Sequence, residues 1–529
     1  MFRSTSVAFL AVFTLLLAAC SDRGTEPAVS VEGPDSTESA EKAHSEGIHW
    51  YKDSIDEAFA SAKAQNKPLF LYWGAEWCPY CHELKATIFI RDEFIALSRQ
   101  FIALDMSNGN AENIRYADKF KIYGLPTVIV FNPEGQELTR IAGGMDIQQY
   151  ASVLELTLNA LRPVAQLVAT VQAGEALSDS DWELLAGYSW SQDRGRALGD
   201  QQVSKVLNEI ANACPAHLSV ARSRLQMAAL GAWFEEEEET RESALAQTHL
   251  GAVESVLANA SLSQANLTAL AYLGTDAVNV LASGERQQQL QSQLVNLFQA
   301  GVENADFNVL KRATILSGWS EVVTALLADG QSLAQNQVDW GKAQADALLA
   351  TLGPYQTHAG VNSLWGVYYE VGLEADARNT LLHGIKVSKA PYYFMSGMAY
   401  IERKAENTEA ALDWYRKAWE TTKVPMHRAR WGGGYVSRLV SMSPESVADI
   451  RAVSAQVLQE ILSQNDGLQN YKSRLERMNR SLLEWSKTEQ DSRAPVLAGL
   501  RAQIEAVCSD ENKSADVESP CTQYFLTDV

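Results

Sequence analysis

Residues 68–82 read PLFLYWGAEWCPYCH, an apolar run followed by two cysteines. The run 68–73 shows no alternation with polar residues, which is the pattern of a strand buried on both faces of a sheet. Cys78 and Cys81 follow directly, and Pro79 suits the first turn of a helix because that turn does not need its missing N–H. The stretch therefore predicts a buried strand, a short turn and a helix that begins at the first cysteine.

The residues around this stretch alternate between strand and helix patterns. The turn sequence Asn132-Pro133-Glu134-Gly135 joins the last two predicted strands. The order of elements is β-α-β-α-β-α-β-β-α. The predicted strands are 48–51, 68–73, 101–105, 127–131 and 137–141, and the predicted helices are 54–65, 78 to about 97, 111–120 and 146–161.

This order closely resembles the thioredoxin fold over residues 48–161, with Trp-Cys-Pro-Tyr-Cys after the second strand and Gly124-Leu125-Pro126-Thr127 before the fourth. The strings 73–78 and 83–85 are similar to those of periplasmic thioredoxin-like domains of bacteria. The resemblance implies an α/β domain in which Pro126 forms a cis peptide bond, faces the cysteines and lets Leu125 pair with an extended client peptide. The client-binding residues that it implies are Trp77, Pro79, Tyr80, Leu125 and Pro126.

The cysteine pair predicts thiol chemistry. The species that attacks a disulfide is a thiolate, so the attacking cysteine needs a lowered pKa and an accessible sulfur. A helix N-terminus favours negative charge, which makes Cys78 the predicted attacking thiolate and Cys81 the resolving thiol one turn later. The Pro-Tyr pair also occurs in glutaredoxins and in one branch of periplasmic disulfide isomerases. We favour the reductase or isomerase direction.

Three neighbouring side chains are candidates to tune the pKa of these thiols. His82 either adds positive charge near the pair or is an exposed spectator. Thioredoxins carry a buried Asp six residues before the first cysteine, whereas this chain has Tyr72 there, and a phenol is a poor base near neutral pH. Glu76 and Glu83 are the candidates to replace the missing acid, and the proton route stays open.

The length of the chain indicates the number of domains, and its net charge limits the classes of partner. The chain has 529 residues, 46% of them hydrophobic, and a formal net charge of -21. At least two domains are expected at this length. The acidic charge disfavours nucleic acid or an anionic membrane surface as the main partner. The acidic run 235–239 is either a solvated face or a docking patch.

Residues 1–20 are predicted to be an export signal, with Arg3 before an apolar run that is too short to span a membrane comfortably. The box Leu17-Ala18-Ala19-Cys20 resembles the bacterial lipoprotein signal. That resemblance implies lipid attachment at Cys20 and, with Ser21 next, a place on the periplasmic side of the outer membrane. The alternative is an ordinary secretory signal with a chance cysteine. Residues 21–47 are rich in Ser, Glu, Asp, Pro and Gly and are predicted to be a flexible tether.

Export would place the six cysteines where disulfides persist. Cys508 and Cys521 lie in a polar C-terminal tail, 508–529, and are close enough to form a small disulfide loop. Cys214 is left over. With His217 it is either half of a metal site or, as we expect, a buried structural thiol. The sequence offers no second ligand pair at a suitable spacing, so neither a metal nor a cofactor is predicted.

Residues 163–507 show helical patterns without strands and predict a second, all-α domain. Four positions recur with a period of 34 residues, which resembles tetratricopeptide repeats. A degenerate helical-hairpin solenoid is the preferred interpretation, and an irregular bundle is the alternative. The string 431–435, WGGGY, is either a binding surface or a helix-breaking turn. The recurring residues are Ala377, Leu381, Gly384 and Pro391, repeated as Ala411, Tyr415, Ala418 and Pro425.

These features predict a lipid-anchored periplasmic thiol-disulfide oxidoreductase. Its partners would be exported proteins with thiols or disulfides and a membrane or periplasmic redox protein, with no nucleic acid. A second hypothesis makes the helical domain the functional part, which binds or assembles partners, and the thioredoxin-like domain a docking module. A third, less favoured hypothesis treats Cys78, Cys81 and His82 as ligands of a metal- or haem-delivery protein.

Overall fold

The computed structural model describes residues 47–107, 111–142, 147–159, 162–199, 201–325, 327, 331–464, 467–510 and 523–525. These residues divide into two compact units. The first holds the described residues of 47–107 and 121–380, and the second holds those of 111–120 and 381–525. The boundary between the units, at residues 380 and 381, lies inside the predicted helical domain 163–507. The strands therefore belong to the same unit as the first part of that domain.

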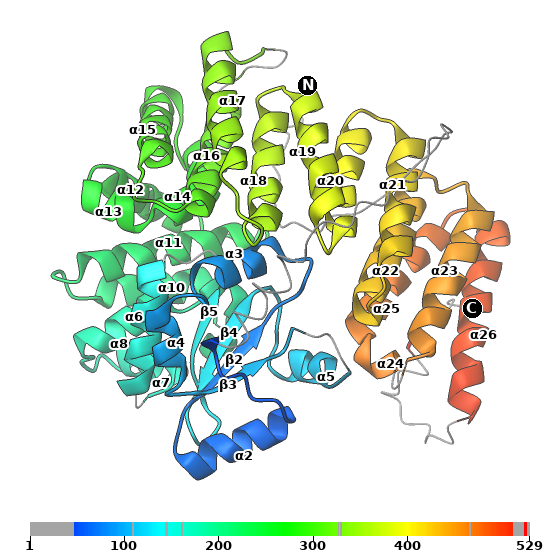
Figure 1. Ribbon diagram of the computed structural model, residues 1–529, viewed down its shortest axis with the longest axis horizontal. Helices are drawn as coiled ribbons and strands as arrows, with labels where there is room; N and C mark the ends of the chain where they lie inside the picture. The colour runs from blue at the N-terminus through cyan, green and yellow to red at the C-terminus, as the bar shows by residue number, and fades with distance from the viewer. Residues whose placement is uncertain are drawn as a thin grey trace. The chain divides into compact units, whose positions relative to one another are not determined.

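A four-stranded sheet with the order β3-β2-β4-β5 lies in the first unit (Figure 1). Strand β2 pairs in parallel with β3 and antiparallel with β4, and β4 pairs antiparallel with β5. The predicted strand 48–51 is reduced to an isolated bridge between Trp50 and Ala103. The strands are β2 (Leu69–Trp73), β3 (Ile102–Asp105), β4 (Thr127–Phe131) and β5 (Glu137–Ala142).

Strand β2 is central and is buried at every residue, as its continuous apolar sequence predicts. Aromatic side chains pack on one face of the sheet around Phe70 and Tyr72, and Phe89 stands edge-on to the Tyr72 ring at 5.0 Å between centroids. This side of the sheet is part of a larger core that continues into the helical region.

The helices of the α/β part are α2 (Ile55–Gln65), α3 (Pro79–Thr87), α4 (Asp92–Ser98), α5 (Ala111–Lys119) and α6 (Ile147–Asn159). Ser54 begins α2 in a capping box with Glu57. The single helix predicted from 78 to about 97 is wrong, because the chain turns after Thr87. Ile88 and Phe89 are both buried, and the Phe89 N–H donates to the Leu84 carbonyl five residues back. A continuous helix would have pointed these neighbours about 100° apart.

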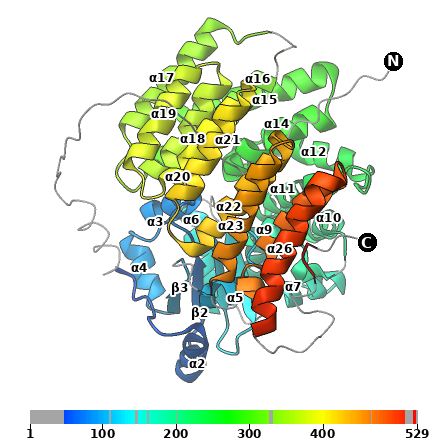
Figure 2. The same ribbon diagram turned by 90° about the vertical axis from the view of Figure 1, so that its right-hand side faces the viewer.

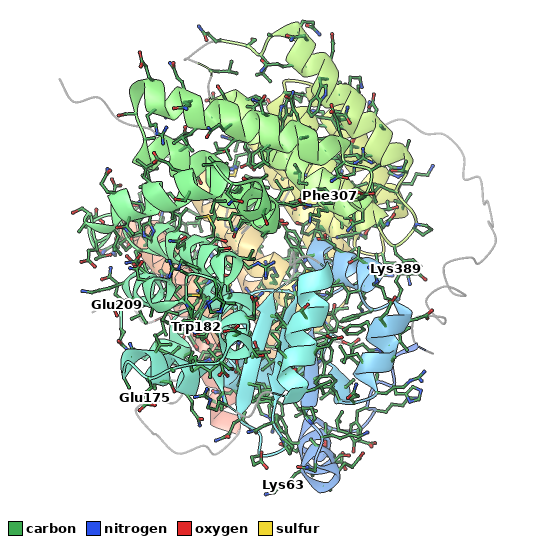
Figure 3. All side chains as sticks on the ribbon, turned by 90° about the vertical axis from the view of Figure 1, so that its left-hand side faces the viewer. Lys63, Glu175, Trp182, Glu209, Phe307 and Lys389 are labelled. Atoms are coloured by element: carbon green, nitrogen blue, oxygen red, sulfur yellow. The ribbon has the colours of Figure 1, made fainter. Side chains whose placement is uncertain are left out.

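The helical part of the first unit packs directly on the sheet. The Ser189 N–H donates to the Arg140 carbonyl of β5 at 2.8 Å. Gly187 lies so close to Val153 of α6 that a Cβ there would come within 2.4 Å of its side chain. Trp182, labelled in Figure 3, belongs to the same buried cluster as the strands.

The helices that follow α6 in the first unit begin at Pro163, where the sequence predicts the change to an all-α region. They are α7 (Val164–Gln172), α8 (Asp179–Gly187), α9 (Trp190–Asp193), η1 (Arg196–Leu198), α10 (Val203–Ala213), α11 (Ser219–Glu235), α12 (Leu245–Leu257), α13 (Ala260–Ala265), α14 (Leu267–Leu281), α15 (Gly284–Glu303), α16 (Val309–Ala325), α17 (Gln335–Ala350), α18 (Thr357–Glu370) and α19 (Glu374–Val387), the last of which ends beyond residue 380.

The described secondary-structure elements of the second unit are all helices, and Figure 2 shows α23 and α26 side by side. Pro391 and Pro425 each open a helix, and the small residues Ala411 and Ala418 are buried. The tetratricopeptide resemblance stays a prediction. The helices are α20 (Pro391–Lys404), α21 (Thr408–Thr421), α22 (Pro425–Met442), α23 (Val447–Leu462), α24 (Gly467–Asn470), α25 (Lys472–Ser486) and α26 (Gln490–Asp510).

The glycine string 431–435 does not break a helix, contrary to one of its two interpretations. It lies inside α22, with Trp431 and Tyr435 buried. A Cβ on Gly432 would come within 2.9 Å of the Trp419 indole nitrogen. The glycine therefore permits close helix packing.

The predicted export signal, Cys20 and residues 21–46 of the tether lie outside the described residues. Within the described part of the chain, no helix is both long and apolar enough to cross a membrane.

Candidate redox site

Cys78 is the N-cap of α3, with Pro79 in the first turn, as the sequence predicts. Its sulfur accepts a hydrogen bond from the Cys81 N–H at 3.2 Å. This N–H lies in the first turn of the helix and also donates to the Cys78 carbonyl at 3.1 Å, so it is shared between the sulfur and that oxygen. The arrangement places partial positive charge at the Cys78 sulfur and favours its thiolate form.

Both cysteines are thiols, and each residue is only 2% exposed. They form a small apolar cluster with Ala75, against which Trp77, Tyr80 and Leu125 pack. The sequence leads us to expect an accessible attacking sulfur. In this structure the neighbouring side chains cover it.

The Leu125–Pro126 peptide bond is cis, as the resemblance predicts. The loop that contains it is held by Gln192 of α9, which the sequence gave no reason to select. Gln192 donates to the Pro126 carbonyl at 2.8 Å and accepts from the Thr127 hydroxyl at 2.8 Å. The helical region thus supports the loop that faces the cysteines.

The peptide group between Trp77 and Cys78 is bonded at both ends. The Cys78 N–H donates to the Ala75 carbonyl at 3.1 Å, and the Trp77 carbonyl lies 3.1 Å from Nε2 of His358. His358 belongs to α18, and it is 281 positions away in the chain. No local sequence signal pointed to it.

A second long-range contact involves Tyr80, within the Cys-Pro-Tyr-Cys motif. The Tyr272 hydroxyl of α14 donates to the Tyr80 hydroxyl at 3.2 Å, and the two rings stand edge-on. Tyr272 is itself 47% exposed. Polar groups of two helices of the helical region therefore contact Tyr80 of the motif and Trp77, the residue before it.

Comparison with known proteins assigns the α/β part. The family model described as "Thioredoxin-like domain" matches residues 55–157. Residues 55–157 form a thioredoxin-like domain. The chain thus has an α/β sheet domain followed by a large helical region, which is the fold predicted from the sequence.

Two curated relatives of the thioredoxin-like domain are each named "Thiol:disulfide interchange protein DsbD". The protein from Yersinia pestis is 35% identical over 103 residues, which cover 18% of this chain and 17% of the relative. The protein from Pseudoalteromonas atlantica is 31% identical over 104 residues, which cover 19% of this chain and 18% of the relative. The chain thus matches less than a fifth of the length of these relatives.

A solved structure described as "DsbH Oxidoreductase" is 22% identical and covers 22% of this chain and 86% of that one, with a TM-score of 0.20.

Tyr72 occupies the place of the acid that thioredoxins bury. It is fully buried, and its hydroxyl makes no hydrogen bond of good geometry. Loss of water raises the Tyr72 pKa well above its usual value, and the nearby Cys81, Asp105 and Cys78 raise it further. The phenol therefore stays protonated at neutral pH, and it can donate to a thiolate but cannot accept a proton.

The two candidate replacement acids differ. Loss of water around the Glu83 carboxyl raises its pKa to about 7, so this group exchanges protons near neutral pH. The Glu76 side chain is exposed, and its backbone carbonyl lies 2.6 Å from Nε2 of His82. Asp105, which pairs with Tyr72 across the parallel strands, is an acid near the site that the sequence did not single out.

The remaining cysteines lie in other settings. Cys214 is fully buried, as expected of a structural thiol, and burial raises its pKa to about 11. His217 pairs with Asp179 at 3.2 Å. Cys508 is disulfide-bonded, while its predicted partner Cys521 lies outside the described residues. No group of three or more His, Cys, Asp or Glu side chains suited to a metal ion occurs among the residues that the structure describes.

Proposed function

We propose that the chain is a thiol-disulfide oxidoreductase that exchanges disulfides with other proteins through Cys78 and Cys81. The observation that carries the proposal is the position of Cys78 at the start of α3, where its sulfur accepts the Cys81 N–H. A helix N-terminus lowers a thiol pKa, and a lowered pKa increases the thiolate fraction that reacts. The names of the relatives of the thioredoxin-like domain agree with this chemistry.

The reduced enzyme reacts in two exchange steps. The Cys78 thiolate attacks one sulfur of a client disulfide, so that a Cys78–client bond forms and the client disulfide breaks. The displaced client sulfur leaves as a thiolate and takes up a proton. Cys81 then loses its proton and attacks the Cys78 sulfur, which releases the second client thiolate. The client gains two electrons, and the enzyme holds the oxidation as a Cys78–Cys81 disulfide.

Surrounding groups assist the resolving step. The Tyr72 hydroxyl stabilises the Cys81 thiolate, because it is buried and keeps its proton. Glu83, whose pKa is about 7, is the proposed proton acceptor, since its carboxylate is available near neutral pH. Trp77, Pro79, Tyr80, Leu125 and Pro126 are the proposed client-binding residues.

We further propose that the protein acts on exported clients from a lipid anchor at Cys20, with residues 21–47 as the tether. The box that ends at Cys20 supports this placement. A dithiol partner on the membrane or in the periplasm would return Cys78 and Cys81 to the reduced state. Replacement of Cys20 by Ser should release the protein from washed membranes; the same membrane yield for the variant and wild type would contradict the anchor.

The proposal is tested with the full chain. In intact cells, Cys81→Ala should accumulate mixed disulfides with exported proteins, because Cys78 attacks and nothing resolves the product. Cys78→Ala should accumulate none. Cys214→Ala is the matched control, since it removes a buried thiol away from the motif. Equal cross-linking in all three variants, or none in Cys81→Ala, would refute the proposal.

A reduction potential measured on the same chain then decides the direction. A reduction potential of about -270 mV indicates a reductase, and one of about -120 mV indicates an oxidase.

A further inference from the structure

Helix α18 lies against the cysteine helix α3, as Figures 1 and 2 both show. The contact includes His358, which is 5% exposed. Its Nε2 atom lies 3.1 Å from the Trp77 carbonyl oxygen. Because a carbonyl oxygen only accepts, His358 must donate from Nε2–H.

Burial fixes the charge of this imidazole. Loss of water, and to a smaller extent the nearby His82, lower the His358 pKa to about 3. The hydrogen bond to Trp77 opposes this shift and does not cancel it. His358 is therefore a neutral donor at neutral pH.

A second imidazole, that of His82, contacts the carbonyl of the residue before Trp77. Nε2 of His82 lies 2.6 Å from the Glu76 carbonyl, and the rings of His82 and His358 stack at 4.5 Å between centroids with 19° between their planes. Two consecutive carbonyls before Cys78 thus each receive an imidazole N–H. One imidazole comes from the thioredoxin-like domain, and the other comes from the helical region.

The bonded carbonyl belongs to the peptide group that carries the Cys78 N–H. That N–H donates to Ala75, so the donor from His358 holds the opposite end of the same peptide plane. A peptide carbonyl carries partial negative charge, which repels a thiolate nearby. A donor on the oxygen reduces this repulsion and prevents the plane from turning.

We propose that His358 is a positioning residue of the redox centre, supplied by the helical region, which holds the Trp77–Cys78 peptide group and favours the Cys78 thiolate. This inference rests on the proposed thiol-disulfide function. The helical region is then part of the redox centre and not a separate appendage. Tyr272, which bonds Tyr80 at 3.2 Å, adds a second contact to the motif from the same region.

The test uses the full chain and four substitutions. His358→Gln places an N–H close to the position of Nε2, so it keeps the donor and loses the ring. His358→Phe keeps a ring that can stack and loses the donor. His358→Asn keeps a small polar side chain that is too short to reach the carbonyl, and it replaces Phe if that variant fails to fold. His217→Gln is the control, because His217 lies on the surface beside Asp179.

Two quantities are measured: the Cys78 pKa, from thiolate absorbance or the pH profile of alkylation, and the equilibrium of the cysteine pair with glutathione. Loss of the donor should raise the Cys78 pKa by about one unit, a tenfold change in thiolate fraction. It should also make the pair harder to reduce by about tenfold, or about 30 mV for two electrons, because the reduced form loses stabilisation. His358→Gln and His217→Gln should match wild type.

The outcomes separate the two proposals. If wild type forms no reversible Cys78–Cys81 disulfide, the proposed function fails. If wild type forms it and the variants without the donor keep the wild-type pKa and potential, only the role of His358 is refuted. An equal shift in the Gln variant would also refute that role, because it would attribute the effect to general packing.

Discussion

Replacement of Tyr72 by Phe tests how a buried phenol serves where thioredoxins bury an acid. The Tyr72 ring is fully buried and packs edge-on against Phe89 at 5.0 Å, and Phe retains that contact. The hydroxyl makes no hydrogen bond of good geometry, and an unpaired buried hydroxyl costs about 1–3 kcal/mol. When the cysteines form a disulfide, the variant should therefore be at least as stable as wild type, by up to about 1 kcal/mol after allowance for the vacated volume.

The resolving step should respond in the opposite direction. After loss of water, Cys81 is the group that affects the Tyr72 hydroxyl most. When Cys81 loses its proton to resolve the mixed disulfide, its thiolate accepts a charge-assisted hydrogen bond from this hydroxyl, worth about 1.5–3 kcal/mol. Since about 1.4 kcal/mol corresponds to a tenfold change in rate, the variant should resolve the mixed disulfide about 10- to 150-fold more slowly.

Tyr150→Phe provides the matched control. Tyr150 of α6 is 1% exposed, its hydroxyl also makes no hydrogen bond of good geometry, and burial alone raises its pKa. Its replacement should leave the rate of the resolving step unchanged. The assays are the rate at which a Cys78 mixed disulfide is resolved and urea unfolding of the oxidised proteins. If Tyr72→Phe behaves like Tyr150→Phe, the hydroxyl does not stabilise Cys81 and the reasoning is wrong.

Three further predictions concern the two units. Because the folded-state pKa of Glu83 is about 7 against a usual 4.5, its contribution to the unfolding free energy is present at low pH and is lost as pH rises through 7. Glu83→Gln should remove this pH dependence in urea unfolding. An unchanged slope of unfolding free energy against pH would contradict the prediction. Gln192→Ala should lower the unfolding free energy by about 1–3 kcal/mol through the lost bonds beside Pro126, and slow exchange with a disulfide peptide; an unaltered melting curve would count against it. Cys508→Ser should destabilise the second unit by about 3 kcal/mol if Cys521 closes the loop, and mass spectrometry of the oxidised chain would reveal any other pairing.

The sequence predicted those parts of the site that depend on local pattern. The continuous apolar run identified β2, and the Cys-Pro pair identified the start of α3. Pro126 was recognised from its loop, and the peptide bond before it is cis. Each of these features depends on residues that are adjacent in the chain, so a pattern of a few letters is sufficient.

The parts that the sequence missed depend on distant residues. His358 and Tyr272 lie 281 and 192 positions from their partners, and neither stands in a motif. The break between α3 and α4 was missed for a related reason: Ile88 and Phe89 both pack inward on the sheet, and helix propensity does not report that requirement. The predicted accessible sulfur was covered because Trp77, Tyr80 and Leu125 pack over the cysteines.

The shared core has a consequence for how the redox centre must be studied. Residues 48–161 look separable in the sequence, yet their buried cluster continues through Trp182 to Leu225. Arg140 of β5 is fully buried, and its partner Glu137 is also bonded by Tyr188 and Arg196 from the helical region.

A fragment that ends at residue 161 would expose part of this core and lose those ion-pair partners. It would also lose Gln192, Tyr272 and His358, three side chains of the helical region that contact the site. A potential measured on such a fragment would describe a different redox centre. The reduction potential should therefore be measured on the full chain. A fragment ending at residue 161 that gave the same potential as the full chain would show that none of these three contacts tunes the cysteines.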